Sequence, residues 1–362
     1  MRIAIIAPPF IAVPPVAYGG TELFVANLAE ALCDRGHDVV VYANGESRVR
    51  CQVRWTYAEA DWPLVSPEGG TLKSLEHAAW AVSDCLASGF DVVHTNDAIG
   101  VPLSRFLDVP VVHTLHHPYE RELSALYARY PEVCYVAISD AQRGLERMTK
   151  LCTVYHGLQL SDYRFRERKE RYLLFLGRIA PMKGAHLAIE VARRARLPLK
   201  IAGEIQPTFQ EYWDTMVRPH VDGSMIQYVG EADHAKKNEL LGGASALLFP
   251  IQWNEPFGLV MVEAMACGTP VVATGSGGSG EFLLHGENCL RFPIGDASAL
   301  AAAVRRLAEN QDLRRRLVRA GFATATELSV DRLADVLETW HLAAAEHFVN
   351  GRPADRVLKV LG

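Results

Sequence analysis

Short runs of apolar, mostly β-branched residues alternate along the chain with longer amphipathic stretches. The first run covers residues 2–7, and residues 21–35 follow it with leucine and alanine at helical spacing. Further strand candidates in the first half of the chain are 39–42, 92–94, 111–113 and 135–138. Continuous apolar strands separated by helices are typical of a parallel sheet that is covered on both faces.

The same alternation begins again near residue 172. Strands are expected at 172–176, 199–202, 226–229, 246–250 and 270–273, with helices at 185–195, 257–267 and 297–310. Residues 44–75 are less regular, and we expect a surface excursion there. Residues 163–171 are highly charged, which favours a solvated connector over a basic membrane-binding patch. The pattern therefore predicts two doubly wound α/β domains of similar size that face each other across a cleft, with ligands outside the carboxyl ends of the strands.

Composition agrees with a folded protein of about two domains. The chain has 362 residues, of which 49% are hydrophobic and 22% charged. A net charge of −5 excludes the overall basic character expected of a nucleic-acid-binding protein. Residues 1–160 carry 12 basic and 18 acidic side chains, whereas the remainder carries 25 and 24. An anionic small ligand is therefore expected on the second half.

The cysteines and the lengths of the apolar runs indicate where in the cell the protein is located. The seven cysteines are widely spaced and include no Cys-x-x-Cys, which argues against a disulfide framework or a zinc site and for a reducing cytosol. No stretch reaches the ~18 consecutive apolar residues that span a bilayer. The apolar N-terminus is short and broken by two prolines, so we interpret it as a buried strand and not as a signal peptide. We expect a cytoplasmic protein without a transmembrane segment; peripheral membrane contact is not indicated.

The most informative stretch runs from residue 253 to 273 and follows a predicted strand. Pro256 suits the first turn of a helix, which would leave the amides around Phe257, Gly258 and Leu259 free to bind an anion such as phosphate. Glu255 is expected just before this helix and Glu263 about two turns inside it. The two acids suit hydrogen bonds to ligand hydroxyls; a helix-end charge and an exposed helix acid are the alternative.

A second motif, Leu-Gly-Arg-Ile-Ala-Pro-Met-Lys-Gly at 176–184, directly follows a predicted strand. It places Arg178 and Lys183 five residues apart on one turn. A guanidinium binds two phosphate oxygens at once and an ammonium adds a compact charge, so the pair suits a diphosphate. Two solvated loop cations are the alternative.

Three further motifs lie at expected strand ends. Tyr-Gly-Gly-Thr-Glu at 18–22 opens the first helix, and its glycines permit close backbone approach to an anion or a sugar hydroxyl. His-Thr-Leu-His-His at 113–117 supplies hydrogen-bonding groups near neutral pH but no metal-binding pattern. The Gly-rich loop at 274–281 can form an anion-binding concavity. The alternative is a purely structural tight turn for the first motif, structural strand-end histidines for the second, and a flexible linker for the Gly-rich loop.

These motifs, in this order, resemble glycosyltransferase family 4. The resemblance rests on Tyr-Gly-Gly-Thr-Glu, Gly-Arg-x4-Lys-Gly, Glu-x7-Glu with its Gly-Thr-Pro-Val-Val-Ala tail, the Gly-rich loop ending in Glu281, and Gly-Glu-Asn-Cys-Leu at 286–290. It covers essentially the whole chain and is most specific in the C-terminal half. The family implies a GT-B fold with two Rossmann-like domains and retaining transfer from a nucleotide-activated sugar.

The resemblance also implies an organisation of the chain and roles for single residues. We expect an acceptor-binding domain at 1–160, a linker at 161–171, a nucleotide-sugar-binding domain at 172–328, and a C-terminal helical segment at 329–362 that crosses back to the first domain. In the catalytic set, Arg178 and Lys183 stabilise the leaving diphosphate, Glu255 holds sugar hydroxyls and His116 lies over the donor sugar. The full donor-binding set is Gly177, Arg178, Lys183, Glu255, Phe257, Gly258, Leu259 and Glu263, the last at the ribose.

On the acceptor side the resemblance implies Gly19 and Gly20, and we expect further acceptor contacts from residues 44–75 together with His117 and Tyr119. His117 is also a rival of His116 for the donor, because that assignment depends on one residue of register. One departure stands out: many family members have Gly-x-Gly after the third strand of the second domain, where this chain has Ala-Gly-Glu-Ile at 202–205. The departure puts the local nucleotide contacts in doubt but not the fold.

The expected reaction is transfer of a hexosyl group from a UDP-sugar, or second from GDP-mannose, to a hydroxyl of a small-molecule, glycan or lipid-linked acceptor. No metal or other cofactor is expected, because cations and helix-end dipoles can offset the diphosphate charge and the chain has no Asp-x-Asp. The leading alternative is a nucleotide-sugar 2-epimerase of the same architecture. A sugar phosphorylase, a nicotinamide dehydrogenase and an inactive binding protein are weaker alternatives; the dehydrogenase lacks its Gly-x-Gly-x-x-Gly.

Overall fold

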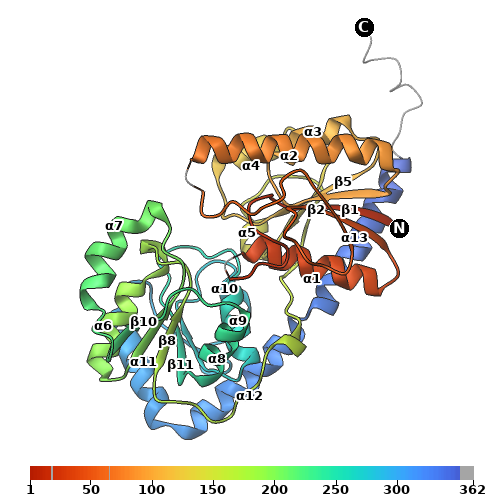
Figure 1. Ribbon diagram of the computed structural model, residues 1–362. Helices are drawn as coiled ribbons and strands as arrows, with labels where there is room; N and C mark the ends of the chain where they lie inside the picture. Colours follow the sequence, from red (N-terminus) through yellow and green to blue (C-terminus); the bar gives the residue numbers. More distant parts are fainter. Residues whose placement is uncertain (18, 65, 351–362) are drawn as a thin grey trace.

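The computed structural model describes residues 1–17, 19–64 and 66–350, and it contains two parallel β-sheets with helices packed on both faces (Figure 1). The seven strands of the first sheet, in the order β3-β2-β1-β4-β5-β6-β7, are β1 (Arg2–Ile6), β2 (Asp38–Ala43), β3 (Gln52–Trp55), β4 (Val92–Thr95), β5 (Val111–Leu115), β6 (Cys134–Ala137) and β7 (Leu151–Thr153). The six strands of the second sheet, in the order β10-β9-β8-β11-β12-β13, are β8 (Leu173–Leu176), β9 (Leu199–Ala202), β10 (Ile226–Tyr228), β11 (Ala246–Phe249), β12 (Val271–Ala273) and β13 (Cys289–Arg291). These sheets confirm the predicted doubly wound α/β class.

Helices connect most successive strands in both halves of the chain. Those of the first half are α1 (Gly20–Asp34), α2 (Pro67–Ser88), α3 (Gly100–Leu103), α4 (Arg121–Tyr127) and α5 (Asp140–Arg143). Those that follow are α6 (Ala185–Ala195), α7 (Gln210–Tyr212), α8 (His234–Gly243), α9 (Leu259–Ala266), α10 (Ser279–Phe282), α11 (Ala297–Glu309), α12 (Gln311–Glu327) and α13 (Val330–Asn350). None of them, within the described ranges, combines the length and apolar character needed to cross a bilayer.

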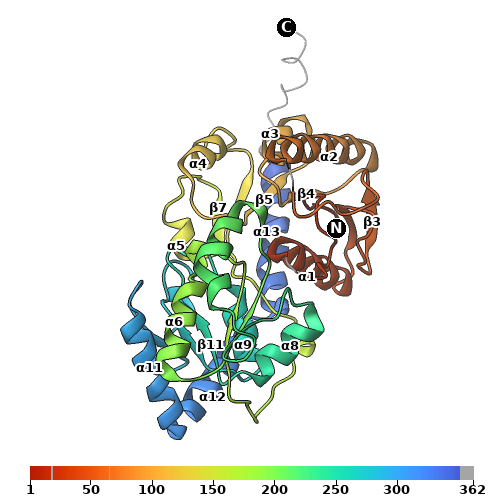
Figure 2. The same ribbon diagram turned by 60° about the vertical axis from the view of Figure 1, so that its left-hand side comes forward.

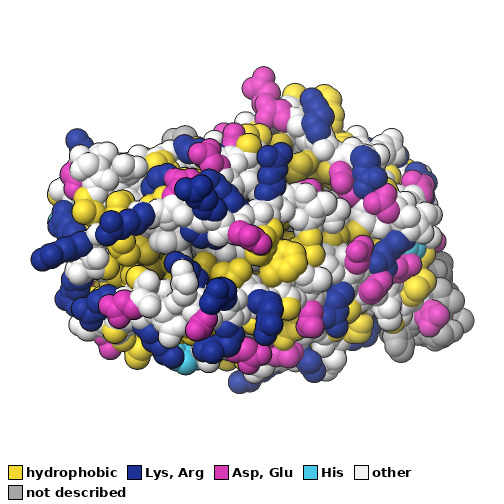
Figure 3. Space-filling view, turned by 90° about the horizontal axis from the view of Figure 1, so that it is seen from below, with side chains coloured by type: hydrophobic (Ala, Val, Ile, Leu, Met, Phe, Trp, Pro, Cys, Tyr) yellow, Lys and Arg dark blue, Asp and Glu magenta, His cyan; other side chains and the backbone are white. Residues whose placement is uncertain are grey.

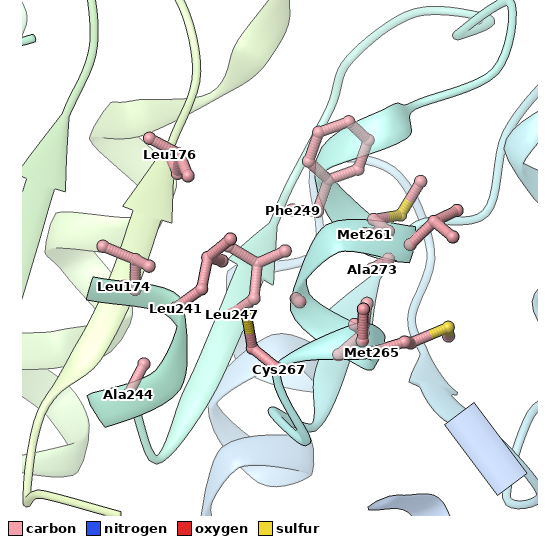
Figure 4. Close-up of a cluster of buried hydrophobic side chains, with 14 of the residues drawn as sticks. Leu174, Leu176, Leu241, Ala244, Leu247, Phe249, Met261, Met265, Cys267 and Ala273 are labelled. Atoms are coloured by element: carbon pink, nitrogen blue, oxygen red, sulfur yellow. The ribbon is translucent and has the colours of Figure 1, made fainter. Parts of the chain in front are cut away.

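Apolar strands of the second sheet pack against α8 and α9, as Figure 4 shows. Leu174 of β8 and Leu247 of β11 are fully buried, and they face Leu241 of α8 and Met265 of α9 in one cluster. Because both faces of β8 and β11 are covered, these strands are continuous apolar runs, which is why they are recognisable in the sequence. This core fixes the carboxyl ends of β8 and β11 side by side.

The C-terminal helix α13 returns to the first sheet, as predicted. It packs along α1 and reaches β4 and β5 (Figures 1 and 2). Leu333 and Leu337 join the core beneath the first sheet, and His341 Nε2 lies 3.0 Å from His94 Nδ1. Residues 351–362 of the predicted C-terminal segment lie outside the described residues. The chain therefore crosses between the halves twice, near residue 160 and near residue 329.

Two segments differ from expectation. The irregular stretch 44–75 contains the edge strand β3 and the start of α2. The strand was not predicted because its sequence, Gln-Val-Arg-Trp, is short and partly polar. The charged stretch 163–171 is not solvated throughout: Tyr163 is buried, and Lys169 Nζ donates hydrogen bonds to the carbonyls of Gly242 and Cys267. The arginines of this stretch, at 164, 166, 168 and 171, are exposed. The surface seen from below mixes Lys and Arg with Asp and Glu (Figure 3).

Candidate active site in the cleft between the two sheets

The loops after β8 and β11 lie against each other at the point where the strand order of the second sheet reverses. Gly184 has φ 78° and ψ 30°, and a Cβ on it would lie 2.1 Å from the carbonyl oxygen of Pro250. Only glycine fits this backbone contact. The amide of Gln252 donates to the carbonyl of Met182 at 2.8 Å, which joins the two loops further. The arrangement brings Lys183 to the residues that follow β11.

Lys183 and Glu255 form the central ion pair of the site. Lys183 Nζ lies 2.7 Å from Glu255 Oε2, and both side chains are largely buried. Trp253 Nε1 donates to the same oxygen at 2.7 Å, and its ring lies 5.1 Å from the ammonium. The amide of Gly278 donates to the Glu255 carbonyl at 2.8 Å, so the Gly-rich loop after β12 holds the backbone of this residue. A cation and a carboxylate thus lie together at adjacent strand ends.

Arg178 lies on the wall of a pocket of about 220 Å³ between the two halves of the molecule. Its Nη1 donates to Gln206 Oε1 at 3.2 Å, and its guanidinium carbon lies 5.8 Å from the Phe209 ring centre. The pocket is lined from the first half by Gly19 and Gly20 and from the second half by Gly177, Arg178, Leu259 and Glu263, all predicted site residues. Tyr18 of the same first-half motif lies outside the described residues.

The helix after β11 starts later than predicted. Gly258 has φ 89°, a left-handed conformation, and α9 begins only at Leu259. Pro256 therefore precedes the helix instead of occupying its first turn, and Glu263 lies one turn inside it instead of two. Leu259 and Val260 line the pocket, and as residues of the first turn their amides have no acceptor within the helix. The predicted anion-binding helix end thus shifts by about two residues.

Glu263 is a buried acid and not an exposed helix carboxylate. Its Oε1 accepts hydrogen bonds at 2.8 Å from both Tyr163 Oη and Lys237 Nζ. Burial is the main cause that raises the pKa of Tyr163, and the negative charge of Glu263 raises it further. The phenol therefore stays protonated and acts as a hydrogen-bond donor. Glu263 therefore offers its remaining acceptor capacity to the pocket that it lines.

His116 and His117 point to different surroundings. His116 Nε2 lies 2.9 Å from Asn96 Oδ1, and its ring stacks on His156 with centres 5.8 Å apart. His156 in turn contacts the ring of Phe257 from the second half, at 5.2 Å. His117 Nε2 instead lies 2.7 Å from Tyr127 Oη within the first half. Of the two, His116 is the one joined through ring contacts to the loop after β11.

Burial governs the protonation of these histidines. It holds the pKa of His116 well below its ordinary value of 6.5, with a further lowering from neighbouring His156. Burial lowers the pKa of His156 to about 4. Both rings are therefore neutral near pH 7, and His116 can share a single N–H with a ligand or with Asn96.

Glu281, at the end of the Gly-rich loop, joins the two halves. Its two carboxylate oxygens accept hydrogen bonds from the backbone amides of Asp140, at 3.0 Å, and Ala141, at 2.6 Å. Tyr155 Oη donates to the same carboxylate at 2.7 Å. The predicted ligand loop thus also connects the second half to the start of α5.

The sequence reasoning missed several residues of the pocket. Glu204, Glu231 and Lys237 line it but were not singled out for binding. Glu204 lies within the Ala-Gly-Glu-Ile departure, which is the one signal that could have found it. Several predicted site residues do not line this pocket. They are Lys183, Glu255, Phe257, Gly258, His116, His117 and Tyr119. Tyr119 is 41% exposed.

No group of three or more His, Cys, Asp or Glu side chains within the described ranges is arranged to hold a metal ion. The cationic groups near the cleft are Arg178, Lys183 and Lys237. Lys183 contacts the carboxylate of Glu255, and Lys237 contacts that of Glu263. The site thus contains cationic and acidic side chains close to the ends of parallel strands.

Two family models match the chain, one in each half. Residues 162–324 match glycosyl transferases group 1, and residues 18–189 match glycosyltransferase family 4. A glycogen synthase of Mycobacterium tuberculosis is 29% identical, over 85% of this chain and 86% of that protein. A phosphatidyl-myo-inositol mannosyltransferase of Mycobacterium leprae is also 29% identical, over 89% and 91%.

Solved structures agree with the fold. A sucrose-phosphate synthase from Thermosynechococcus elongatus superimposes with a TM-score of 0.80 at 20% identity, covering 94% of this chain and 98% of that one. Anabaena HepE in complex with UDP and glucose gives 0.77 at 19% identity, covering 95% and 100%. These likenesses confirm the predicted GT-B arrangement of two Rossmann-like halves. The chain is a glycosyltransferase, and its two model matches, which together span residues 18–324, support the family 4 type.

Proposed function

We propose that this glycosyltransferase moves a hexosyl group from a nucleoside-diphosphate sugar to a hydroxyl acceptor with retention of the anomeric configuration. A UDP-sugar is the first choice of donor and GDP-mannose the second. The observation that carries the proposal is the Lys183–Glu255 ion pair at the ends of the adjacent strands β8 and β11, with Arg178 on the same loop after β8 as Lys183. The names of the relatives support the donor class, since HepE binds UDP and glucose and another relative is a mannosyltransferase.

Arg178 and Lys183 are assigned to the donor diphosphate. Charge grows on the leaving phosphate as the glycosidic bond breaks, and preorganised cations stabilise that charge without solvent reorganisation. The helix start at Leu259 adds backbone donors near the same anion. These groups can offset the diphosphate charge without a metal ion, so we propose a metal-independent reaction.

The remaining roles follow the chemistry of each side chain. Glu255 accepts hydrogen bonds from sugar hydroxyls, and Glu263 accepts those of the ribose. Neutral His116 faces the donor sugar, whereas Gly19, Gly20, His117 and Tyr119 belong to the acceptor side. The departing phosphate oxygen removes the acceptor proton on the same face of the sugar, which gives retention without a protein nucleophile. Detection of a covalent glycosyl-enzyme by mass spectrometry would contradict this route.

We also propose the domain division predicted from the sequence: 1–160 for the acceptor, 172–328 for the donor, 161–171 as linker and 329–362 crossing back. The division is supported by the two sheets and by the two chain crossings near residues 160 and 329. A reducing, cytoplasmic location is proposed from the seven cysteines, all free thiols.

The first test is a thermal-shift series with UDP, GDP, ADP, dTDP and NAD, each with and without EDTA. A ligand at 100 times its Kd stabilises the fold by about 2.7 kcal/mol, which gives a measurable shift. We expect one nucleoside diphosphate to raise the midpoint equally with and without EDTA. A shift with NAD alone, or one abolished by EDTA, contradicts the proposal. Incubation of the matching nucleotide sugar without acceptor then separates a 2-epimerase, which would convert it to an isomeric nucleotide sugar.

The second test removes each cation. Arg178→Ala and Lys183→Ala should each lower kcat by about 100-fold or more, because each removes a preorganised stabiliser of the leaving group. Lys150→Ala, an exposed lysine of the first half, serves as the control and should leave kcat unchanged. Wild-type turnover in either of the first two variants would refute the assignment.

A further inference from the structure

The segment that follows β9 departs from the family pattern and carries a buried carboxylate. Glu204 lies in the Ala-Gly-Glu-Ile sequence at 202–205, and only 4% of its surface is exposed. Its Oε1 accepts a hydrogen bond from Trp62 Nε1 at 2.6 Å. Trp62 belongs to the excursion between β3 and α2 in the first half of the molecule. A buried acid of the donor half is therefore held by a side chain of the acceptor half.

The same carboxylate continues to Arg178. Glu204 Oε2 accepts a hydrogen bond from Gln206 Nε2 at 3.0 Å, and Gln206 Oε1 accepts one from Arg178 Nη1 at 3.2 Å. Phe209, three residues further on, contributes the ring near the guanidinium. One short segment, 204–209, thus supplies both a hydrogen-bond acceptor and an aromatic ring to the arginine assigned to the diphosphate.

The backbone reinforces this connection. The amide of Ile179 donates to the carbonyl of Glu204 at 2.8 Å, and Gly177 donates to Ala202 at 3.0 Å. A Cβ on Gly203 would lie 1.9 Å from the carbonyl oxygen of Gly177. The loops after β8 and β9 are therefore in direct contact, and Glu204 is held next to Arg178 by main-chain bonds.

The chemistry of the three side chains fixes the direction of each hydrogen bond. An ionised carboxylate only accepts, so Glu204 must receive the amide N–H of Gln206, and this turns the amide oxygen toward Arg178. If the Gln206 amide were reversed, its NH₂ would face the guanidinium, donor against donor. Burial raises the pKa of Glu204, whereas the hydrogen bonds from Gln206 and Trp62 lower it. The two donors offset part of the cost of burying this charge.

We propose that Glu204 is a positioning residue, which orients Gln206 so that Arg178 is held at the donor diphosphate, and that Trp62 makes this alignment depend on the first half of the molecule. The inference rests on the proposed role of Arg178. It extends that role by naming the groups that hold the arginine and the contact through which approach of the acceptor half aligns it.

The test is a double-mutant cycle between Glu204 and Arg178. Rates are measured as nucleoside diphosphate release from UDP-glucose or GDP-mannose, whichever the protein turns over. Glu204→Gln keeps the size and an acceptor for Trp62 but allows the Gln206 amide to reverse. We expect kcat to fall about tenfold while the donor KM changes less than about threefold, since the alignment acts on the developing charge. In the Arg178→Ala background, the same substitution should change kcat by less than about twofold.

One further variant and two controls complete the design. Trp62→Phe removes only the indole N–H and should lower kcat about threefold, with no additional effect in Glu204→Gln. Trp55→Phe, a half-exposed tryptophan at the end of β3, and Glu211→Gln, an exposed acid on α7, should leave kcat unchanged. Thermal midpoints of all variants show whether each is folded at the assay temperature.

Each remaining outcome overturns the inference in an identifiable way. If Glu204→Gln lowers kcat by the same factor with and without Arg178, then its effect does not pass through the arginine. If the substitution alters the choice between UDP-glucose and GDP-mannose at unchanged kcat, then Glu204 reads the base. If Arg178→Ala itself leaves kcat unchanged, the proposed function of Arg178 fails, and the inference fails with it.

Discussion

The buried ion pair of Glu263 and Lys237 allows the contribution of a single carboxylate to nucleotide binding to be tested. The carboxylate lies 2.8 Å from both Lys237 Nζ and Tyr163 Oη, and it lines the pocket assigned to the nucleotide. Glu263→Gln should weaken binding of the cognate nucleoside diphosphate about tenfold, because a neutral amide is a poorer acceptor for ribose hydroxyls than a carboxylate. Isothermal titration calorimetry measures this. Glu239→Gln, an exposed acid on α8, should bind like the wild type; equal affinities in all three proteins would remove Glu263 from the ribose site.

At the residue scale, the sequence revealed chemical types but not pairings. Arg178, Lys183 and Glu255 stand out because they follow apolar strands, whose carboxyl ends share one edge of a parallel sheet. The Lys183–Glu255 contact joins residues 72 positions apart, and nothing in either motif specifies it. Glu204 was noticed only as a departure from a pattern, since its partner Trp62 lies 142 positions away in an irregular stretch.

At the scale of elements, the loop between β8 and α6 depends on one glycine. Gly184 is left-handed, and a Cβ there would meet the carbonyl oxygen of Pro250 at 2.1 Å. Gly223 has a similar φ of 75°, but a Cβ on it would meet nothing within 4 Å. Gly184→Ala should therefore cost about 1–3 kcal/mol more unfolding free energy than Gly223→Ala, the difference being the clash alone. Urea unfolding of both variants measures it; equal losses would show that the loop simply moves aside.

Elements were predictable where burial imposes a continuous apolar pattern. The strands β1, β8 and β11 and the helix α6 lie where the sequence placed them, because both faces of the sheets are covered. The edge strand β3 was missed, since an edge strand is only partly buried and needs no apolar run. The start of α9 was misplaced because Pro256 is acceptable in a first helical turn, whereas the left-handed Gly258 that delays the helix is visible only in the structure.

At the scale of the whole molecule, the two halves are joined by contacts between residues far apart in the chain. Glu281 accepts two amide hydrogen bonds from the start of α5, about 140 positions earlier, and α13 packs along α1. The resemblance to a family of known architecture supplied the return of the last helix, which no local pattern specifies. Periodicity alone gave two sheets and a cleft, but not the way in which their loops meet.

Buried histidines give the whole molecule a predictable response to acid. Burial lowers the pKa of His113 and of His341 to about 3 and that of His156 to about 4, from an ordinary value of 6.5. In the unfolded chain these histidines bind protons with a pKa of 6.5, whereas in the folded chain they stay neutral. Their contribution to the free energy of unfolding is therefore fully present above pH 6.5 and decreases as the pH falls toward 4. At pH 5 each of these histidines lowers the free energy of unfolding by about 2 kcal/mol.

One buried acid acts in the opposite sense over part of this range. Burial raises the pKa of Glu22 to about 7, so between pH 4.5 and 7 the folded chain binds a proton that the unfolded chain releases, which favours folding at the acid end. Three histidines outweigh one carboxyl, and the free energy of unfolding should still fall by several kcal/mol from pH 7 to pH 5. Urea unfolding at pH 7, 6 and 5 measures this slope. His156→Gln should flatten it, whereas a pH-independent free energy of unfolding would mean that these rings are accessible to protons in the folded protein.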